Sequence, residues 1–218
     1  MSGSVMSVSA KVAEAAVFVI DDNPEVCDGI KALVESAGLT CEIFESPTQF
    51  LKREIGKGPH CLLLDVRLPE MSGLDFQKQL TNSGRAIPTI IMTGHGDIAM
   101  SVRAMKTGAV EFLTKPLREQ DVLDAVYVAL DLHRAQLAAE DRLRELRTRY
   151  QTLSNREREI MPLVTSGLLN KQIAAEIGLS EITVKVHRHN LIRKLQAKSL
   201  PDLVRMADLL QASDKKVA

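Results

Sequence analysis

The sequence has no long apolar run, few cysteines and no net charge. No stretch approaches the roughly 20 consecutive apolar residues that a membrane helix needs, so we expect no membrane partner. The three cysteines, Cys27, Cys41 and Cys61, form no CxxC pair, so they indicate buried thiols in a reducing compartment and neither a disulfide framework nor a zinc site. The first fifteen residues lack a basic segment leading into an apolar one, so we expect a cytoplasmic protein without a secretory signal.

The absence of net charge conceals an uneven distribution along the chain. Residues 1–130 carry 12 Lys and Arg against 17 Asp and Glu, a net charge of −5. Residues 131–150 carry 5 against 4, a net +1, and residues 151–218 carry 11 against 7, a net +4. An acidic front and a basic end indicate two domains with different partners, with nucleic acid as the candidate for the basic end. Charge alone would still favour an ordinary solvated surface.

Short apolar segments rich in β-branched residues alternate with stretches of helical spacing in the first 130 residues. The expected strands are 16–20, 40–44, 61–65, 89–92 and 110–113. Strands alternating with helices predict a parallel sheet covered on both faces, and the size suits a flavodoxin-like doubly wound domain. Helix ends are expected at Gly38, Gly58, Gly84 and Gly108. We therefore predict an α/β domain of (βα)5 type over residues 15–130, after a disordered tail at 1–14.

A helical pattern continues without a break beyond Asp121. No Gly or Pro occurs between residues 117 and 161, and apolar residues recur on one side of the helix up to Leu153, with one phase slip. We predict that residues 131–150 form a long helical linker, because a flexible tether would be rich in such breakers. Two interpretations of this linker remain open: a short coiled coil, or a solvated helix laced by ion pairs.

The last 68 residues contain only helix signals. They predict an all-α domain of four helices over residues 151–218, at about 155–166, 171–177, 181–196 and 200–211. Ser154, Asn170 and Ser180 stand at the expected N-caps, and Glu157 completes a capping box with Ser154. Gly178 makes the turn between the second and third helices. A short helix, a tight turn and a longer helix together predict a helix-turn-helix.

Polar side chains stand at four of the five predicted strand ends. These residues are Asp21 and Asp22, Asp65, Thr93 and Lys115. Because parallel strands place their ligands at one carboxyl edge, we expect these side chains to lie together. Carboxylates and a backbone carbonyl suit a hard cation, so we predict an Mg²⁺ or Mn²⁺ site of Asp21, Asp22, Asp65 and the carbonyl of Arg67. Taken singly, each residue has a plainer interpretation as a cap, a strand former or a solvated loop residue.

In this order and spacing, residues 15–130 resemble the receiver domain of two-component response regulators. The resemblance implies that Asp65 accepts a phosphoryl group from a histidine kinase, with Thr93 as switch hydroxyl, Phe112 as switch aromatic and Lys115 as the lysine of a Lys-Pro pair. Metal and Lys115 would offset the charge of the transferred group. The new oxygens would draw Thr93 inward and let Phe112 rotate, which favours homodimers through the helix expected at about 97–106.

The C-terminal helices resemble the LuxR-type helix-turn-helix of NarL/FixJ response regulators. The matching segments are 153–159, Gly167, 170–174 and 183–187. The resemblance implies that the third helix enters the major groove of double-stranded DNA, with Lys185, Val186 and His189 as base readers. The expected phosphate contacts are Lys171, Thr183, Arg188 and Arg193. RNA polymerase is the further partner implied, and activation of transcription is the usual outcome in this family.

Four residues depart from the usual pattern. Glu70 stands where the receiver family commonly has Gly, and Pro162 lies inside the first C-terminal helix, where we expect a local kink. Arg67 and His95 each stand two residues past a site residue. We hypothesise that both set the lifetime of the aspartyl phosphate, against the plainer interpretation that they are exposed polar residues.

We interpret the chain as a DNA-binding regulator of the FixJ branch, not an enzyme beyond slow hydrolysis of its own phosphate. A phosphatase of the haloacid dehalogenase fold is the rival, but residue 23 is Asn where its Asp-x-Asp motif needs Asp. A protein-binding adaptor without DNA affinity would leave Lys185, Arg188 and Arg193 unexplained. Without phosphate, either the receiver masks the DNA-binding helices or the dimer is too weak, and the long linker favours the second.

Overall fold

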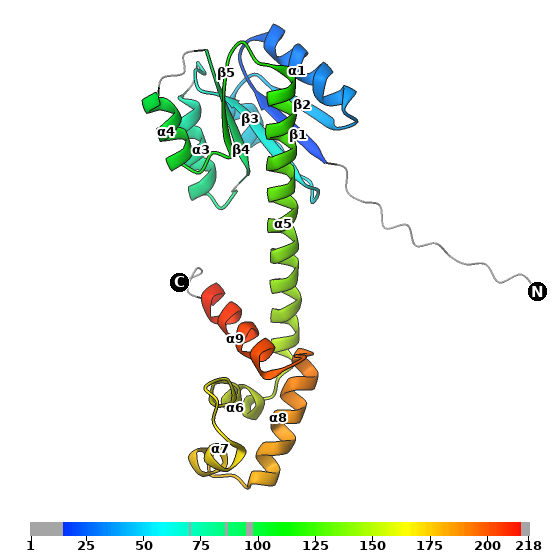
Figure 1. The fold of residues 1–218 in the computed structure, drawn as a ribbon, viewed down its shortest axis with the longest axis vertical. Helices are drawn as coiled ribbons and strands as arrows, with labels where there is room; N and C mark the ends of the chain where they lie inside the picture. Colours follow the sequence, from blue (N-terminus) through cyan, green and yellow to red (C-terminus); the bar gives the residue numbers. More distant parts are fainter. Residues whose placement is uncertain (1–14, 70, 86, 95–97, 215–218) are drawn as a thin grey trace, which may run out of the picture. The chain divides into compact units, whose positions relative to one another are not determined.

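The computed structural model describes residues 15–69, 71–85, 87–94 and 98–214 (Figure 1). The chain divides into two compact units, Met1–Leu137 and Ala138–Ala218, each with its own core. The predicted tail at 1–14 and the hypotheses on Glu70 and His95 fall outside the described residues.

The first unit contains one fully parallel sheet, as predicted. Its strands are β1 (Ala16–Ile20), β2 (Thr40–Phe44), β3 (His60–Asp65), β4 (Thr89–Thr93) and β5 (Glu111–Thr114), in the order β2-β1-β3-β4-β5. Every residue of β3 is buried, which agrees with its unbroken apolar sequence, because a central parallel strand is covered on both faces. The flavodoxin-like fold class predicted from the alternating pattern is confirmed.

Helices cover both faces of this sheet (Figure 1). They are α1 (Pro24–Ser36), α2 (Pro47–Leu51), α3 (Gly73–Asn82), α4 (Ile98–Lys106) and α5 (Glu119–Gln151). Val17, Val19 and Leu63 point into a core with α1 and α5, and the alternate residues Phe18 and Leu62 point into a core with α2, α3 and α4. The period of two along each strand therefore separates two apolar layers.

Three of the four glycines expected at helix ends do end helices. Gly38, Gly84 and Gly108 have φ of 77°, 75° and 89°, the left-handed conformation that favours glycine. The prediction for Gly58 was wrong, because α2 already ends at Leu51 and Gly58 belongs to the loop before β3. The carbonyl of Gly58 lies 2.9 Å from Nδ1 of His60.

The second unit is all helical after the end of α5. Its helices are α6 (Asn155–Thr165), α7 (Asn170–Ile177), α8 (Glu181–Leu195) and α9 (Leu200–Asp214). The capping box of Ser154 and Glu157 and the cap by Ser180 are confirmed. The cap predicted at Asn170 was wrong: Leu169 is the N-cap, its N–H donates to Gln172, and Asn170 is the first helical residue.

The linker segment 131–150 is helical throughout as part of α5. Pro162 lies within α6, which continues to Thr165.

In the part of the chain that the structure describes, no helix is long and apolar enough to cross a membrane.

An ion pair between the buried Glu157 and the half-buried Lys194 joins α6 to α8 in the second unit. Oε2 of Glu157, on α6, lies 2.7 Å from Nζ of Lys194, on α8, and accepts the Ser154 N–H at 2.7 Å. Burial alone would raise the pKa of Glu157, but these hydrogen bonds outweigh it and hold the pKa below its usual value of 4.5. A depressed pKa means that the folded state favours the carboxylate, so the pair stabilises the unit above pH 4.5.

We predict that Glu157→Gln removes this pH-dependent stability. The contribution of Glu157 is fully present above the unfolded-state pKa and is lost as the pH falls through the lower folded-state pKa. In the variant, amide hydrogen exchange of α6 and α8 should be faster at pH 6, and its further change between pH 5 and pH 3 should be smaller than in wild type. Glu159→Gln is the matched control, because Glu159 pairs with Arg156 on the surface and should change little. Equal pH profiles for wild type and Glu157→Gln would contradict the prediction.

Candidate functional site

Two buried carboxylates lie side by side at the carboxyl edge of the sheet. Strand β1 pairs with β3 in the register Ile20 with Leu64, so the next residue of each strand, Asp21 and Asp65, follows at the same level. Asp21 is 1% exposed and Asp65 is 4% exposed, whereas Asp22 is exposed. The sequence predicted this edge, and the structure brings the two acids together there.

The ammonium group of Lys115 binds both buried acids. Its Nζ lies 2.6 Å from Oδ2 of Asp21 and 2.8 Å from Oδ1 of Asp65. The other oxygen of each carboxylate accepts a backbone N–H, that of Asn23 at 3.0 Å and that of Arg67 at 2.7 Å. Lys115 follows β5, and the peptide bond between Lys115 and Pro116 is cis. The two acids thus share one cation, and each also has a fixed orientation.

Burial and charge act in opposite directions on this group. Burial raises the pKa of Asp65, and the hydrogen bond and charge of Lys115 oppose this rise without cancelling it. Burial alone would lower the pKa of Lys115, but the hydrogen bonds to Asp21 and Asp65 outweigh it, so the pKa is raised. Lys115 therefore remains an ammonium ion, and its charge favours the carboxylate form of Asp65 against the effect of burial.

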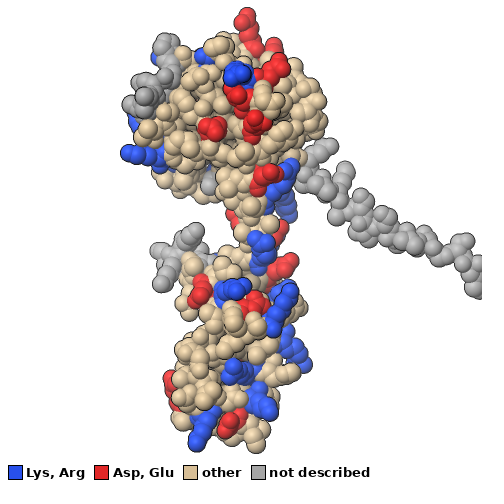
Figure 2. All heavy atoms as spheres, viewed as in Figure 1, with Lys and Arg blue, Asp and Glu red and all other residues tan. Residues whose placement is uncertain are grey.

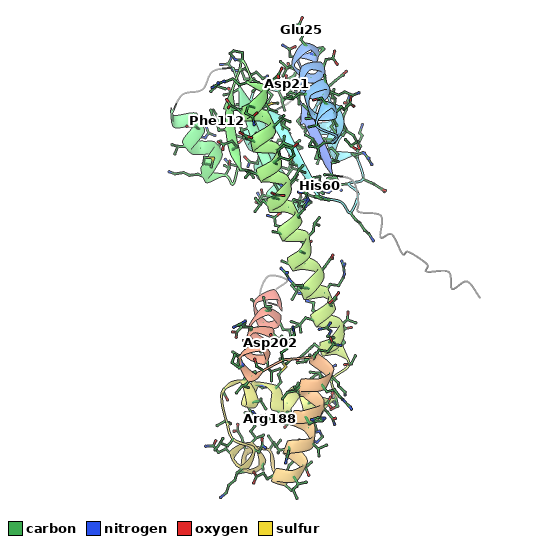
Figure 3. All side chains as sticks on the ribbon, turned by 45° about the vertical axis from the view of Figure 1, so that its right-hand side comes forward. Asp21, Glu25, His60, Phe112, Arg188 and Asp202 are labelled. Carbon is green, nitrogen blue, oxygen red and sulfur yellow. The ribbon has the colours of Figure 1, made fainter. Side chains whose placement is uncertain are left out.

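The predicted switch residues lie next to this group. Asp65 pairs with Met92 across β3 and β4, so Thr93 stands one residue beyond that partner and is fully buried. The carbonyl of Thr93 accepts the N–H of Lys115 at 2.7 Å, which connects the two predicted residues through the backbone. Phe112, on β5, is half-buried and packs against the core beneath α3 and α4 (Figure 3).

The side chains at this edge offer carboxylate oxygens, the donor atoms that hard cations such as Mg²⁺ prefer. Asp21 and Asp65 present carboxylates that already gather around a positive charge, and the exposed Asp22 lines a hollow of about 420 Å³ beside them. Asp28 and Glu45 line the same hollow and add negative charge. Within the described ranges, no three His, Cys, Asp or Glu side chains converge as they would around a bound metal. The residues fit Mg²⁺ or Mn²⁺ by donor type, with Lys115 between the two buried acids.

Gly73 is a site residue that the sequence interpretation passed over. A Cβ atom at this position would lie 2.1 Å from the backbone carbonyl oxygen of Asp65. The N–H of Gly73 donates to the carbonyl of Val66 at 2.9 Å, and Arg67 forms a bridge with Ser72, so the loop folds back on the end of β3. A glycine shortly after a strand-end acid, opening a helix, is the signal that could have found it.

The helix-turn-helix presents the predicted reading residues on its outer surface. Val184, Leu191 and Leu195 of α8 are buried. Of the seven predicted DNA contacts, Thr183 and Arg188 are half-buried and the others are exposed: Lys171, Lys185, Val186, His189 and Arg193. Nη1 of Arg188 donates to Oδ1 of Asn170 at 3.1 Å, which ties α8 to the start of α7.

Two large apolar side chains extend this surface. Ile182 is 78% exposed on α8, one turn before Val186, and Leu169 is 68% exposed at the start of α7. Leu169 is not among the contacts predicted from the sequence. Apolar contacts of this kind suit thymine methyl groups in a major groove.

Figure 2 shows acidic side chains gathered on the upper part of the first unit and basic side chains spread over the second.

The chain combines a parallel sheet that has acidic residues and a lysine at its carboxyl edge with a helix-turn-helix. This combination is typical of a transcription regulator that receives a signal. Comparison with family models agrees with this class. Residues 17–127 match the response regulator receiver domain, and residues 151–207 match the bacterial regulatory proteins of the luxR family.

Similarity to known proteins extends over nearly the whole chain. Response regulator protein TodT of Pseudomonas putida is 47% identical over 197 residues, 90% of this chain and 87% of TodT. Nodulation protein W of Bradyrhizobium diazoefficiens is 46% identical, over 92% of this chain and 88% of that protein. The structure of response regulator StyR has a TM-score of 0.77 and 44% identity, covering 90% of this chain and 99% of StyR.

Full-length FixJ from B. japonicum has a TM-score of 0.53 and 35% identity, covering 89% of this chain and 96% of that one. The chain belongs to the NarL/FixJ family of two-component response regulators, which combine a receiver domain with a LuxR-type DNA-binding domain. Its relatives are transcriptional regulators.

We predict that Gly73→Ala destabilises the first unit. The added methyl would overlap the Asp65 carbonyl, and relief of such overpacking typically costs about 1–3 kcal/mol. Gly29→Ala is the matched control: Gly29 is an exposed residue within α1 with open space around it, where Ala should raise stability by about 0.5–1 kcal/mol. Urea unfolding of both variants measures the difference. A Gly73→Ala protein as stable as wild type would show that the loop yields easily.

Proposed function

We propose that Asp65 is the phosphoacceptor of this regulator and that a histidine kinase is its donor. A carboxylate oxygen of Asp65 attacks the phosphorus of the kinase phosphohistidine, the phosphorus–nitrogen bond breaks, and the imidazole leaves with the electron pair. The observation that supports this most is Lys115, whose Nζ lies within 2.8 Å of both Asp65 and Asp21. A partly buried ammonium positioned there can bind an oxygen of the transferred group while its charge develops.

The metal belongs to the same proposal. Asp21, Asp22, Asp65 and the backbone carbonyl of Arg67 would hold Mg²⁺ or Mn²⁺, which when bound neutralises the negative oxygens crowded at the site. Asp65 is oriented for its role by the Arg67 N–H and by Lys115. The aspartyl phosphate would then hydrolyse slowly, with the side chain of Arg67 controlling access of water.

Thr93 and Phe112 would convert the phosphate into a change of surface. Thr93 is buried on the strand next to Asp65, and its backbone carbonyl accepts the backbone N–H of Lys115, so Lys115 and Thr93 are held together by this backbone bond. Phe112 is half-buried against the core that includes α4. On α4, Val102 and Met105 are 45% and 50% exposed, and such apolar side chains supply a homodimer surface.

The second unit would act on promoter DNA in the cytoplasm. Lys185, Val186 and His189 would read base edges, and Lys171, Thr183, Arg188 and Arg193 would contact phosphates. A dimer would set two α8 helices about one DNA turn apart and recruit RNA polymerase, so that transcription rises. Because residues 131–150 are helical, we favour a weak dimer over masking as the reason for inactivity without phosphate.

Lys115→Ala should reduce phosphorylation at least tenfold, and Asp65→Asn should abolish it. Without the ammonium, Asp21 and Asp65 face each other as buried like charges, so the Asp65 carboxylate is no longer available. Mass spectrometry after incubation with acetyl phosphate and Mg²⁺ measures the modification, and gel filtration with beryllofluoride measures dimers. Lys57→Ala, at an exposed loop position, is the matched control. A wild-type protein that stays monomeric with the mimic would refute the dimer switch.

Lys185→Ala and Lys171→Ala should affect DNA binding differently. Footprinting of wild type against Asp65→Asn across the genome first identifies an operator. On that operator, loss of a base contact at Lys185 should cost about 1–3 kcal/mol and relax the sequence preference. Loss of a phosphate contact at Lys171 should weaken all sequences equally and reduce the slope of log affinity against log salt by about 1. Identical behaviour of the two variants would contradict the assignment of base reader and phosphate contact.

A further inference from the structure

Two buried histidines meet at the end of the sheet opposite to the acidic site. His60 is the first residue of β3, and Asp65 is the last residue of the same strand. The backbone N–H of His60 donates to Nδ1 of His133, on α5, at 2.8 Å. The two rings lie 3.9 Å apart between centroids, and the side chains are 9% and 6% exposed. Figure 3 shows His60 beside α5, at the end of the sheet away from Asp21.

This hydrogen bond requires one form of His133. Nδ1 can accept the backbone N–H only when it carries no proton, so the ring proton must be on Nε2. Burial lowers the pKa of His133, and burial followed by the proximity of His133 lowers the pKa of His60 to about 4. The charged neighbours are paired among themselves: Glu42 with Arg53 beside His60, and Asp131 with Arg134 on α5. The neutral acceptor is therefore the form present near pH 7.

His133 lies where α5 leaves the sheet. Val126, Ala129 and Leu130 of α5 are buried in the core, and His133 is the last buried residue of this helix before the first unit ends at Leu137. Apolar contacts favour burial but are not directional, so they allow a helix to slide or turn. A hydrogen bond to a backbone N–H has strict geometry and fixes both the position and the rotation of α5 on β3.

Loss of this bond would leave a buried backbone donor without a partner. A buried N–H that loses its acceptor keeps the full cost of its removal from water, so α5 resists moving away from β3 at this point. The other end of β3 carries Asp65, whose backbone is in close contact with Gly73 of α3. One strand thus connects the acidic site with the start of the segment that continues into the DNA-binding unit.

We propose that His133 is a positioning residue that couples phosphorylation of the receiver to DNA binding. It acts by holding α5 in one register on β3 through the His60 N–H. The inference rests on the proposed function, since it needs a phosphate signal at Asp65 and a DNA-binding response.

Two substitutions separate the acceptor from the ring. His133→Asn places an amide oxygen at the same number of bonds from the backbone as Nδ1, so it keeps the acceptor and loses the ring. His133→Phe keeps a planar ring against His60 and loses the acceptor. Each full-length variant is treated with acetyl phosphate and Mg²⁺, and its affinity for the operator is measured with and without phosphorylation.

We expect all three proteins to accept phosphate at Asp65 at similar rates. Phosphorylation should raise the operator affinity of wild type and of His133→Asn alike, whereas the gain in His133→Phe should be smaller by about tenfold, within the usual range of coupling between sites. If only the packing of the ring mattered, His133→Phe would keep the gain in operator affinity and His133→Asn would lose it, which is the opposite of the expected result. An undiminished gain in His133→Phe, or an equal loss in both variants, overturns the inference.

Further controls separate a wrong inference about His133 from a wrong proposed function and from a variant that does not fold. If phosphorylation of the wild type leaves its operator affinity unchanged, the proposed function fails and not the role of His133. If His133→Phe does not fold, as judged by failure to accept phosphate, His133→Leu takes its place as a smaller residue without an acceptor. If neither folds while His133→Asn does, the bond serves folding and not coupling, which also overturns the inference.

Discussion

The ion pair network of Lys115 with Asp21 and Asp65 is the constraint on which the rest of the receiver depends. Two carboxylates buried at the ends of adjacent strands would repel each other, and one would become protonated without a nearby cation. Lys115 comes from the end of β5, two strands away from β3 in the sheet, so its ammonium draws three strand ends to one place. The same network leads on to Thr93, whose backbone carbonyl accepts the N–H of Lys115, and it is the group to which we assign phosphate transfer in the proposed function.

The second unit also contains an ion pair between two of its elements, but this pair lies apart from the predicted base readers of α8. The buried Glu157 and the half-buried Lys194 form its ion pair and join α6 to α8, and the capping box fixes the start of α6. The inner face of α8 is fully used by its core, which leaves Lys185, Val186 and His189 on the outside. Here the buried charges serve stability alone, and the chemistry of recognition lies on exposed side chains.

Helix α5 belongs to both units, and its two ends are held by different means. Its first half packs into the core of the receiver, its last turns contribute Leu146 to the core of the second unit, and His133 marks the end of the first contact. Between these contacts the surface of α5 in the single chain is largely exposed and carries short-range ion pairs. The choice between a coiled coil and a solvated helix stays open, because a coiled coil would cover this surface with a second chain.

The strands, most helix ends, and the edge where Asp21, Asp65, Thr93 and Lys115 meet could be predicted from the order of residues alone, because periodicity, capping and the parallel sheet rule are local or general. The sequence by itself could not place the close packing of Gly73 against the Asp65 carbonyl, which leaves no room for a Cβ atom, the bond of Asn170 to Arg188, or the contact of His60 with His133. Those depend on which atoms meet across long stretches of chain. Asn170 could serve equally as a cap or as an acceptor, and only the packing of α8 against α7 decided between them, since hydrogen bonds depend on distance and angle.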